Sequence, residues 1–485
     1  MNAGQALAVC AAIAAATLVA GCGSEYRPVV TPINSSGPPA QPQSYAVVVS
    51  APSPTTAGIA TIIDYSGDTV LAQAPIGPGP NTFTIDQTGS VGYTINSDGT
   101  LSNFPISSTL QAKNVTYSTL STAAQPVNLF SPSSGLWAGD LNGNVADVFI
   151  GSPEAFRLAI PVAPTPVTIV GPGSQGQRLF IISQGNVASG MACNTSSRTG
   201  PAGEADAIET SSNTVSSHIP LGKCPVYAIE SPDTRRVFVL NRGDDTVTVI
   251  DSQTNTLDAC TPFQNQSGQT VTCHPSLPLS TSAGLSGANV PAVAGPVYAE
   301  YNAATNQLIV ANYDGNTVNV IDVSLDEYGN DSATFGTTFT IPVGNNPASV
   351  TVLADGSRAY TANQSDETVT VVNLTSHTVE KTLPVNGHPR TVVSTQNSEY
   401  GKVYVASPDS PFLTVLRTDL DIVDTTILVE GNIVDVRVTT QNGSSGNNLA
   451  VSRTPGYGQP CYLPQSLEPA PTGTQTALQV CRTLP

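Results

Sequence analysis

Cysteine and histidine are the residues of this chain best suited to covalent or metal chemistry, and their spacing favours disulfides. The 485 residues include eight cysteines and four histidines. Six cysteines form three neighbouring pairs, each in a segment that looks inserted or terminal, where a disulfide would restrain a loop. Six cysteines allow fifteen pairings, and the predicted ones are Cys193–Cys224, Cys260–Cys273 and Cys461–Cys481.

Metal binding is the competing interpretation of the same residues. No Cys-x-x-Cys motif occurs, and none of the histidines is paired at ligand spacing. These histidines are His218, His274, His377 and His388. We therefore expect disulfides and no metal site.

Sequence motifs for catalysis or cofactor binding are missing. Gly135, Gly139 and Gly143 are expected in turns, without the strand, loop and helix that make a phosphate-binding loop. No Gly-x-Ser-x-Gly elbow occurs, and no loop has the spaced oxygen ligands and closing glutamate of a calcium site. The sequence therefore predicts no catalytic residue and no cofactor.

Composition indicates a turn-rich β protein with an acidic surface. The chain has 41 glycines and 39 prolines, only 11% of its residues are charged, and its net charge is −18. After residue 25 no stretch keeps the 3.6-residue apolar period of a helix. Because acidic surfaces repel phosphate backbones, and because no Lys/Arg cluster occurs, we expect no binding to nucleic acid.

The N-terminus resembles a bacterial lipoprotein signal. A small, apolar stretch runs from Ala3 to Ala20, and Gly21 and Cys22 follow it. In that family of signals, the peptidase cuts before the cysteine, so Cys22 would become the lipidated first residue, carrying palmitate and anchoring the chain to a membrane. Gly23 after Cys22 favours the outer membrane by the same resemblance. Residues 22–43 are rich in Pro, Ser, Gly and Gln, which predicts a disordered tether.

A repeated pattern of short β-strands organises the rest of the chain. Arg236–Asn241 is followed by Thr246–Asp251, and Leu308–Asn312 is followed by Thr317–Asp322. Gly, Asp, Asn and Ser separate these runs, as in hairpin turns. A third strand ends in a phrase such as Ile341-Pro342-Val343-Gly344, and a fourth begins after another proline, as at Pro347. Proline at a strand end predicts an outer edge, so four strands make one propeller blade.

These residues resemble the YVTN-type β-propeller repeats of bacterial and archaeal surface proteins. Ile309-Val310-Ala311-Asn312 and Val403-Tyr404-Val405-Ala406-Ser407 stand near the Tyr-Val-Ala/Thr-Asn phrase of that family. Thr317–Asp322 matches its second strand and Ile341–Gly344 its closing phrase. The resemblance is strong over residues 225–416. It implies a single all-β propeller of four-stranded antiparallel blades.

The number of blades follows from the aligned position in the first strand of each repeat. That position falls at Val47, Tyr93, Trp137, Phe180, Phe238, Ile309, Tyr360 and Tyr404, with a ninth first strand near Leu449. We therefore predict about eight blades, closed where Ile433–Val438 joins the N-terminal strands; seven blades plus an accessory unit is the alternative. The long spacings contain the two central cysteine pairs, so insertions would carry the disulfides.

Together these patterns predict a signal peptide at 1–21, a tether at 22–43, a propeller at 44–446, and a closing strand with a disulfide-bonded tail at 447–485. The expected function is that of a lipid-anchored binding or scaffold protein of the bacterial cell envelope, at the outer membrane or cell surface. Its ligand, a protein, a small molecule or a glycan, would meet one propeller face.

The alternative function is a hydrolase, because some propellers related to this family resemble lactonases. A site of that type needs His, Glu or Arg side chains that converge on the channel. The scattered candidates are Glu230, Glu300, Arg242, His388 and Arg390.

Overall fold

A computed structural model of the chain describes residues 45–53, 55–65, 67–86, 88–120, 124–132, 135–171, 178–185, 201–395 and 401–439. The chain divides into two units, Met1–Gln41 and Pro42–Pro485, and the described residues all belong to the second. The predicted signal peptide and tether therefore lie outside the described residues. So do the tail at 447–485 and the expected strand near Leu449.

Eight antiparallel sheets form the ring of the second unit, and each sheet is one blade. Within the described residues, seven of them have four strands; the sheet of blade 5 has a short fifth strand in addition, and a separate two-stranded hairpin also occurs. The innermost strands, from blade 1 to blade 8, are β35 (Asn432–Val438), β4 (Thr82–Ile85), β8 (Pro126–Phe130), β12 (Pro166–Val170), β16 (Pro225–Glu230), β23 (Pro296–Asn302), β27 (Pro347–Val352) and β31 (Thr391–Ser394). The second strands are β1 (Tyr45–Ala51), β5 (Val91–Ile95), β9 (Leu136–Asp140), β13 (Arg178–Ser183), β17 (Arg236–Asn241), β24 (Gln307–Asn312), β28 (Arg358–Asn363) and β32 (Lys402–Ala406).

The third strands are β2 (Ala57–Asp64), β6 (Thr100–Pro105), β10 (Val145–Gly151), β14 (Ala202–Glu209), β18 (Thr246–Asp251), β25 (Thr317–Asp322), β29 (Thr368–Asn373) and β33 (Phe412–Arg417). The outer strands are β3 (Thr69–Pro78), β7 (Thr116–Thr119), β11 (Glu154–Pro161), β15 (Thr214–Lys223), β19 (Thr256–Leu257), β26 (Thr338–Pro342), β30 (Thr378–Pro384) and β34 (Ile422–Leu428). Helix in the described residues is limited to three short 3₁₀ turns, at Ala112–Asn114, Thr281–Ala283 and Gln364–Asp366.

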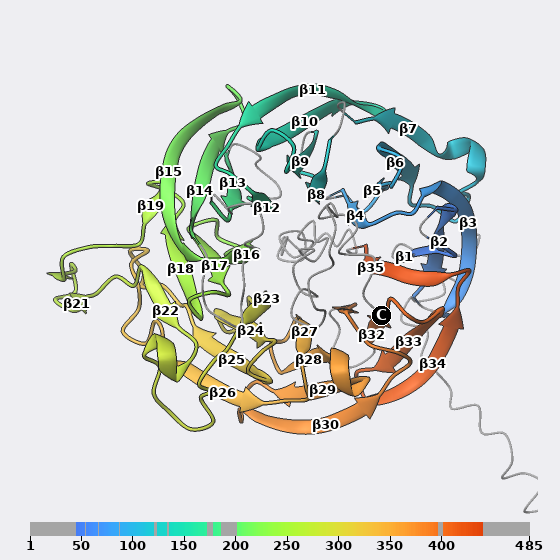
Figure 1. Cartoon of the computed structure of the whole chain (residues 1–485). Coiled ribbons are helices and arrows are strands. Elements are labelled where there is room, and N and C mark those ends of the chain that lie inside the picture. Colours follow the sequence, from blue (N-terminus) through green and yellow to red (C-terminus); the bar gives the residue numbers. More distant parts are fainter. Residues whose placement is uncertain are drawn as a thin grey trace, which may run out of the picture. The chain divides into compact units, whose positions relative to one another are not determined.

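The blades close into a ring, and the two ends of the propeller meet in blade 1 (Figure 1). There β35, the last described strand, pairs with β1, so that Val48 lies opposite Val436. Each innermost strand contacts the innermost strands of both neighbouring blades. The predicted eight blades and the closure at Ile433–Val438 are thus confirmed. Closure removes the open sheet edges that would otherwise pair with other chains.

The blade differs from the sequence repeat by one strand. The strand that begins at Pro347 was expected to be the fourth of its unit, but it pairs with β28 and is the innermost strand of the next blade. Proline fits there because the first residue of a strand need not donate to the ladder. A sequence repeat fixes the order of the strands along the chain, whereas hydrogen bonding decides which four make one sheet.

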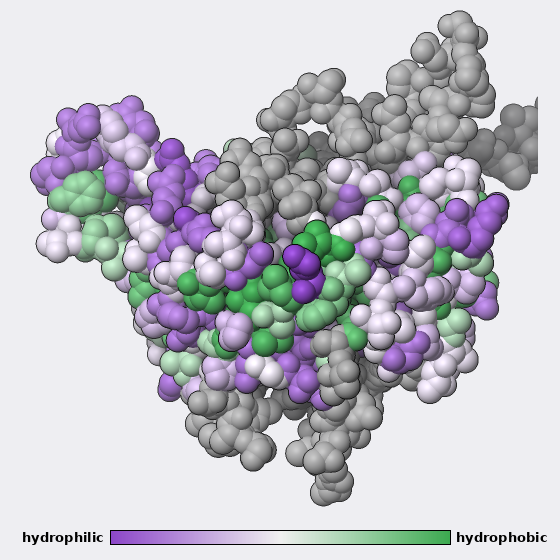
Figure 2. All heavy atoms as spheres, turned by 90° about the horizontal axis from the view of Figure 1, so that it is seen from above, coloured by the Kyte–Doolittle hydropathy of each residue, from purple (hydrophilic) through white to green (hydrophobic). Residues whose placement is uncertain are grey.

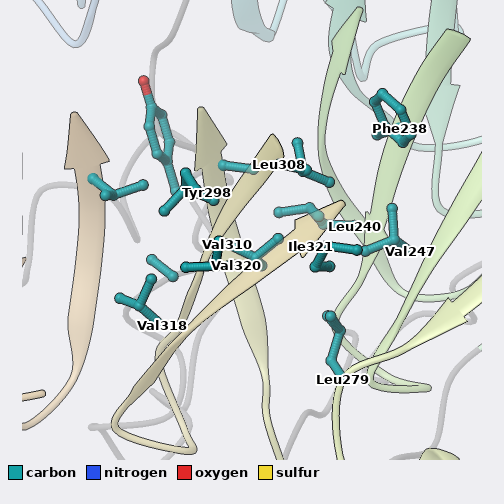
Figure 3. Close-up of a cluster of buried hydrophobic side chains, with 14 of the residues drawn as sticks. Phe238, Leu240, Val247, Leu279, Tyr298, Leu308, Val310, Val318, Val320 and Ile321 are labelled. Atoms are coloured by element: carbon teal, nitrogen blue, oxygen red, sulfur yellow. The ribbon is translucent and has the colours of Figure 1, made fainter. Parts of the chain in front are cut away.

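Apolar packing between neighbouring sheets holds the ring together. Figure 3 shows Phe238 and Leu240 of blade 5 beside Leu308 and Ile321 of blade 6, and all four side chains are fully buried. At about 25 cal/mol per Å² of apolar area, burial between sheets is the main driving force, and a lone blade would lack it. Large apolar side chains are exposed mainly on the outer strands, for example Phe156 and Leu428. Figure 2 shows that hydrophilic residues interrupt the apolar areas of the described surface.

A buried asparagine at the end of the second strand fastens that strand to the third. The Nδ2 of Asn363 donates to the hydroxyls of Thr368 and Thr370, at 3.0 and 2.8 Å. Asn241 makes the same bonds to Thr246 and Thr248 in blade 5. This asparagine is the last residue of the repeated phrase in the sequence. Its role is therefore to satisfy buried polar groups where the hairpin begins.

An insertion with a disulfide interrupts the outer strand of blade 5. Both β19 and β22 (Ser276–Pro278) pair with β18, and between them the chain runs out into a hairpin of β20 (Phe263–Gln264) and β21 (Thr270–Val271). Cys260 and Cys273 form a disulfide across the base of this hairpin. The expectation that insertions carry the disulfides thus holds for this pair.

Candidate functional site

The innermost strands are joined to one another by short polar side chains. Asn128 accepts a hydrogen bond from the Ile169 backbone at 3.3 Å, and Ser349 accepts one from the Val392 backbone at 3.1 Å. The Ser394 backbone donates in the same way to Thr351, at 3.2 Å. These side chains satisfy buried backbone donors, as required where a strand edge is removed from water.

Large or charged residues replace these short side chains in other blades. Tyr227, Tyr298 and Asp435 occupy the position of Asn128 and Ser349, since each pairs with the residue two beyond the aligned position of its second strand. Glu300 and Arg437 occupy the position of Thr351. Arg390 directly precedes β31. We call these six residues the axial cluster: Tyr227, Tyr298, Glu300, Arg390, Asp435 and Arg437.

Direct contacts and charge link the members of the axial cluster. Arg437 pairs with Asp435 at 2.7 Å, and the Tyr227 and Tyr298 rings lie 4.7 Å apart. Arg390 donates from a guanidinium nitrogen to the Val434 carbonyl at 2.9 Å. All members are buried except Arg390, which is half-buried.

The electrostatics favour recognition over proton transfer. Burial raises the pKa of Asp435, while the guanidinium groups of Arg437 and Arg390 act to lower it. Burial, followed by the charge of Glu300, raises the pKa of Tyr298, so its hydroxyl stays protonated. Two guanidinium groups and two carboxyl groups thus lie beside two tyrosine hydroxyls. Such a set can hold a polar ligand by charge-assisted hydrogen bonds.

The structure brings only two of the five catalytic candidates from the sequence into the axial cluster. Glu300 and Arg390 belong to the axial cluster. Arg242 is buried and pairs with Asp314 at 2.9 Å, above the ring of Tyr313. The segment after β17, which carries Arg242, and the segment after β24, which carries Tyr313 and Asp314, therefore hold each other in place.

His388 and Glu230 also lie apart from the axial cluster. His388 Nδ1 is 2.6 Å from Asp409, which also accepts the His388 backbone N–H. Asp366 holds Asn345 by the same two-point contact in blade 7, which indicates a structural role. Burial, then the charge of Asp233, raises the pKa of Glu230 to about 8, with Arg178 opposing.

Sequence reasoning missed four members of the axial cluster. Tyr227 and Tyr298 each follow a Pro-Val dipeptide at the same place in the repeat. Asp435 and Arg437 alternate along the predicted closing strand. The available sequence signal for this cluster was a pair of charged residues two positions apart on an innermost strand, because side chains at i and i+2 share one face.

Among the cysteines, only Cys224, Cys260 and Cys273 are described. Cys224 is fully buried and disulfide-bonded, and its predicted partner Cys193 lies outside the described residues. Cys22, Cys461 and Cys481 lie outside them as well. Within the described ranges, no helix is long and apolar enough to cross a membrane.

One group of acidic and histidine side chains in the described residues brings its ligand atoms within 4.8 Å of one another. It consists of Glu204, Asp206 and His218, on the third and outer strands of blade 4. These residues could hold a metal ion, which the sequence had not suggested.

Comparison with known proteins identifies the fold but no family. No family model matches the chain, and no curated protein does. Apo AztD from Citrobacter koseri is similar in structure, with a TM-score of 0.55 and 12% identity over 83% of this chain and 99% of that one. Dihydro-heme d1 dehydrogenase NirN, in complex with DHE, has a TM-score of 0.55 and 13% identity over 82% of this chain and 76% of NirN.

A candidate 6-phosphogluconolactonase from Bacteroides fragilis is similar too, with a TM-score of 0.50 and 14% identity over 83% of this chain and 99% of that one. At such identities the likeness establishes the propeller fold alone. Propellers host unrelated activities, so function must be argued from the side chains.

Proposed function

We propose that this chain is a lipid-anchored binding protein of the bacterial cell envelope, at the outer membrane or cell surface, with a propeller of YVTN type. The axial cluster would recognise a polar small molecule or glycan that carries an acidic group. The anchor on Cys22 rests on the signal-like N-terminus. The disulfide between Cys260 and Cys273 supports export, because disulfides persist in oxidising compartments.

The cluster of charged side chains at the axis carries this proposal. Buried ion pairs contribute little net stability, because removing two charges from water costs about as much as their attraction returns. Blades 3 and 7 hold their neighbours with Asn128, Ser349 and Thr351 instead, so the fold itself does not require charge there. A ligand with a carboxylate and hydroxyls would complement Arg390 and the tyrosine hydroxyls, while Arg437 keeps its contact with Asp435. Half-buried Arg390 would meet it first.

Ligand binding can be tested with the full-length chain in detergent. We would measure thermal shifts with a neutral hexose, the matching uronic acid, and oligosaccharides that contain it. The proposal expects stabilisation by the acidic sugars only, and its loss in Arg390→Gln. Equal shifts with neutral sugars, or an unchanged response of the variant, would contradict a role for the cluster. Lipidation is tested separately by palmitate incorporation, which should disappear in Cys22→Ala.

The hydrolase alternative keeps one specific point in its favour, which is the presence of Glu300 and Arg390 in the same axial cluster. Its base would have to be Glu300, because His388 contacts Asp409 outside the axial cluster. Lactone hydrolysis that depends on Glu300 in a Glu300→Gln comparison would replace the binding proposal with this one.

A further inference from the structure

The side chains of Glu204, Asp206 and His218 lie on one face of blade 4 because of the strand register. Glu204 and Asp206 are two residues apart on β14, so they share a face of the sheet. His218 on β15 lies directly opposite Asp206, and Pro220 lies opposite Glu204. Side chains from two strands thus converge, although Glu204 and His218 are 14 positions apart in the sequence.

The corresponding positions in another blade are neutral. In blade 7, Thr368 lies opposite Pro384 and Thr370 lies opposite Thr382, in the same register. Glu204, Asp206 and His218 therefore stand where Thr368, Thr370 and Thr382 stand. The fold is satisfied by hydroxyls at these positions, so the two carboxylates and the imidazole need another explanation.

The three side chains do not satisfy one another. His218 Nδ1 lies 2.9 Å from Glu204 Oε1 and 2.6 Å from Asp206 Oδ1. One ring nitrogen carries at most one hydrogen, which can serve only one of these oxygens well. Asp206 is fully buried, and its Oδ2 accepts the Ala163 backbone N–H at 2.6 Å. Its Oδ1 lies within ion-pair distance of His218 Nδ1 but makes no hydrogen bond of good geometry. A buried carboxylate oxygen with an unused lone pair thus points at a nitrogen.

We propose that Glu204 Oε1, Asp206 Oδ1 and His218 Nδ1 bind a divalent transition metal ion, with Zn²⁺ the best fit. A metal ion that replaces the hydrogen on His218 Nδ1 could be bonded by all three of these atoms. Two tetrahedral ligands of one Zn²⁺ ion lie about 3.4 Å apart when metal–ligand bonds are about 2.0–2.2 Å. The observed separations of 2.9 and 2.6 Å would therefore have to widen by several tenths of an ångström, which the exposed His218 side chain allows. Zinc accepts both imidazole nitrogen and carboxylate oxygen, whereas calcium selects oxygen alone.

The environment supports an open site. The His218 side chain is 66% exposed and that of Glu204 39% exposed, so water can complete the coordination. The Ala163 backbone fixes the Asp206 carboxyl from the preceding blade, as an outer hydrogen bond fixes many metal ligands. The site lies on the third and outer strands, so it is separate from the axial cluster and does not depend on its function.

The test is a titration of the full-length chain, without a polyhistidine tag and after treatment with EDTA, with Zn²⁺, Mn²⁺ and Ca²⁺. We expect one equivalent of Zn²⁺ to bind, more tightly than Mn²⁺, and Ca²⁺ to bind far more weakly. His218→Ala should weaken Zn²⁺ binding by roughly 100-fold, since losing even an outer-shell partner costs roughly 10- to 100-fold. The exposed position of His218 makes this variant safe for folding.

Two further variants make the result decisive. The triple variant Glu204→Thr, Asp206→Thr and His218→Thr gives blade 4 the residues of blade 7, and should abolish binding while keeping the melting transition. His388→Asn removes a different histidine–carboxylate pair and should bind Zn²⁺ as the parent does. Absence of Zn²⁺ binding by the parent chain, or equal binding by His218→Ala, would overturn the proposal.

Discussion

Gly344 lies directly against Asn363, and no larger residue fits between them. A Cβ atom added at Gly344 would be 2.6 Å from Asn363 Nδ2. The same contact recurs twice, between Gly222 and Asn241 and between Gly77 and Asn96. The glycine of the closing phrase of one blade thus leaves room for the asparagine of the next. Two conspicuous residues of the repeat are explained by a single contact between blades.

Gly344→Ala should therefore destabilise the ring. The added methyl would displace Asn363 from its bonds to Thr368 and Thr370, and overpacking of this kind costs about 1–3 kcal/mol. Chemical denaturation, followed by circular dichroism, measures the change. Gly139→Ala is the matched control, because its Cβ would meet only Pro166, at an ordinary 3.5 Å. If Gly139→Ala lost as much stability as Gly344→Ala, a steric clash with Asn363 would not be the cause.

A double-mutant cycle isolates the contact itself. Asn363→Ala alone should destabilise the protein by about 1 kcal/mol, because it removes the bonds to the buried Thr370 hydroxyl and the half-buried Thr368 hydroxyl. It also removes the obstacle to a methyl group at position 344. Gly344→Ala should then cost clearly less in the Asn363→Ala background than in the parent chain. Strict additivity of the two changes would argue against the steric explanation.

Blade 3 carries an acid pair where blade 5 has Asn241 and Thr248, and this predicts a pH-dependent stability. Asp140 and Asp147 occupy these positions, and both are buried. Burial, then the charge of Asp140, raises the pKa of Asp147 from 3.8 to about 7. The folded state therefore holds a proton that the unfolded state releases, so stability falls as the pH rises from about 4 to about 7.

Asp147→Thr should remove most of this dependence, although burial also raises the pKa of Asp140, which remains. At about 1.4 kcal/mol per pKa unit, the variant should gain up to about 4 kcal/mol over the parent at pH 8 and little at pH 4. Its hydroxyl can donate to Asp140. Thr370→Asp, the reverse change in blade 7, should create a loss that grows with pH. Parallel stability–pH curves for parent and Asp147→Thr would contradict the account.

The disulfide between Cys260 and Cys273 should hold the inserted hairpin rather than the ring. The two strands of the hairpin pair over only two residues each. A further contact holds the hairpin, between Asn265 and Asp326 at 3.2 Å. Closing a loop of this length contributes about 3 kcal/mol by restricting the unfolded chain. Replacing both cysteines by serine should make residues 261–272 sensitive to protease and leave the other blades protected, as hydrogen exchange would show. Exchange that rises throughout the ring would instead give the disulfide a global role.

The number of blades could be read from the sequence because one apolar or aromatic position recurs in every second strand, from Val47 to Tyr404. The closing strand was also predictable, since Ile433–Val438 has no partner within its own repeat. The group of Glu204, Asp206 and His218 was not. Its members meet only through the register of β14 and β15, which bulges set between Ala202 and Glu204 and between Ala207 and Ile208. Bulges of this kind leave no mark in the residue pattern.

The ion pair of Asp435 and Arg437 should be costly to break from one side. Both side chains are at least 93% buried, so Arg437→Leu leaves a carboxylate without its partner in the interior. Such losses typically cost about 3–5 kcal/mol. The double variant Asp435→Asn with Arg437→Gln should recover much of this stability, because neither charge of the pair is then left without its partner. Arg417→Leu is the control, since it breaks the more exposed pair with Asp419 and should cost at most about 1 kcal/mol. If Arg437→Leu cost no more than Arg417→Leu in a denaturation experiment, the axial cluster would be solvated, and charge burial could not be the reason to assign it a function.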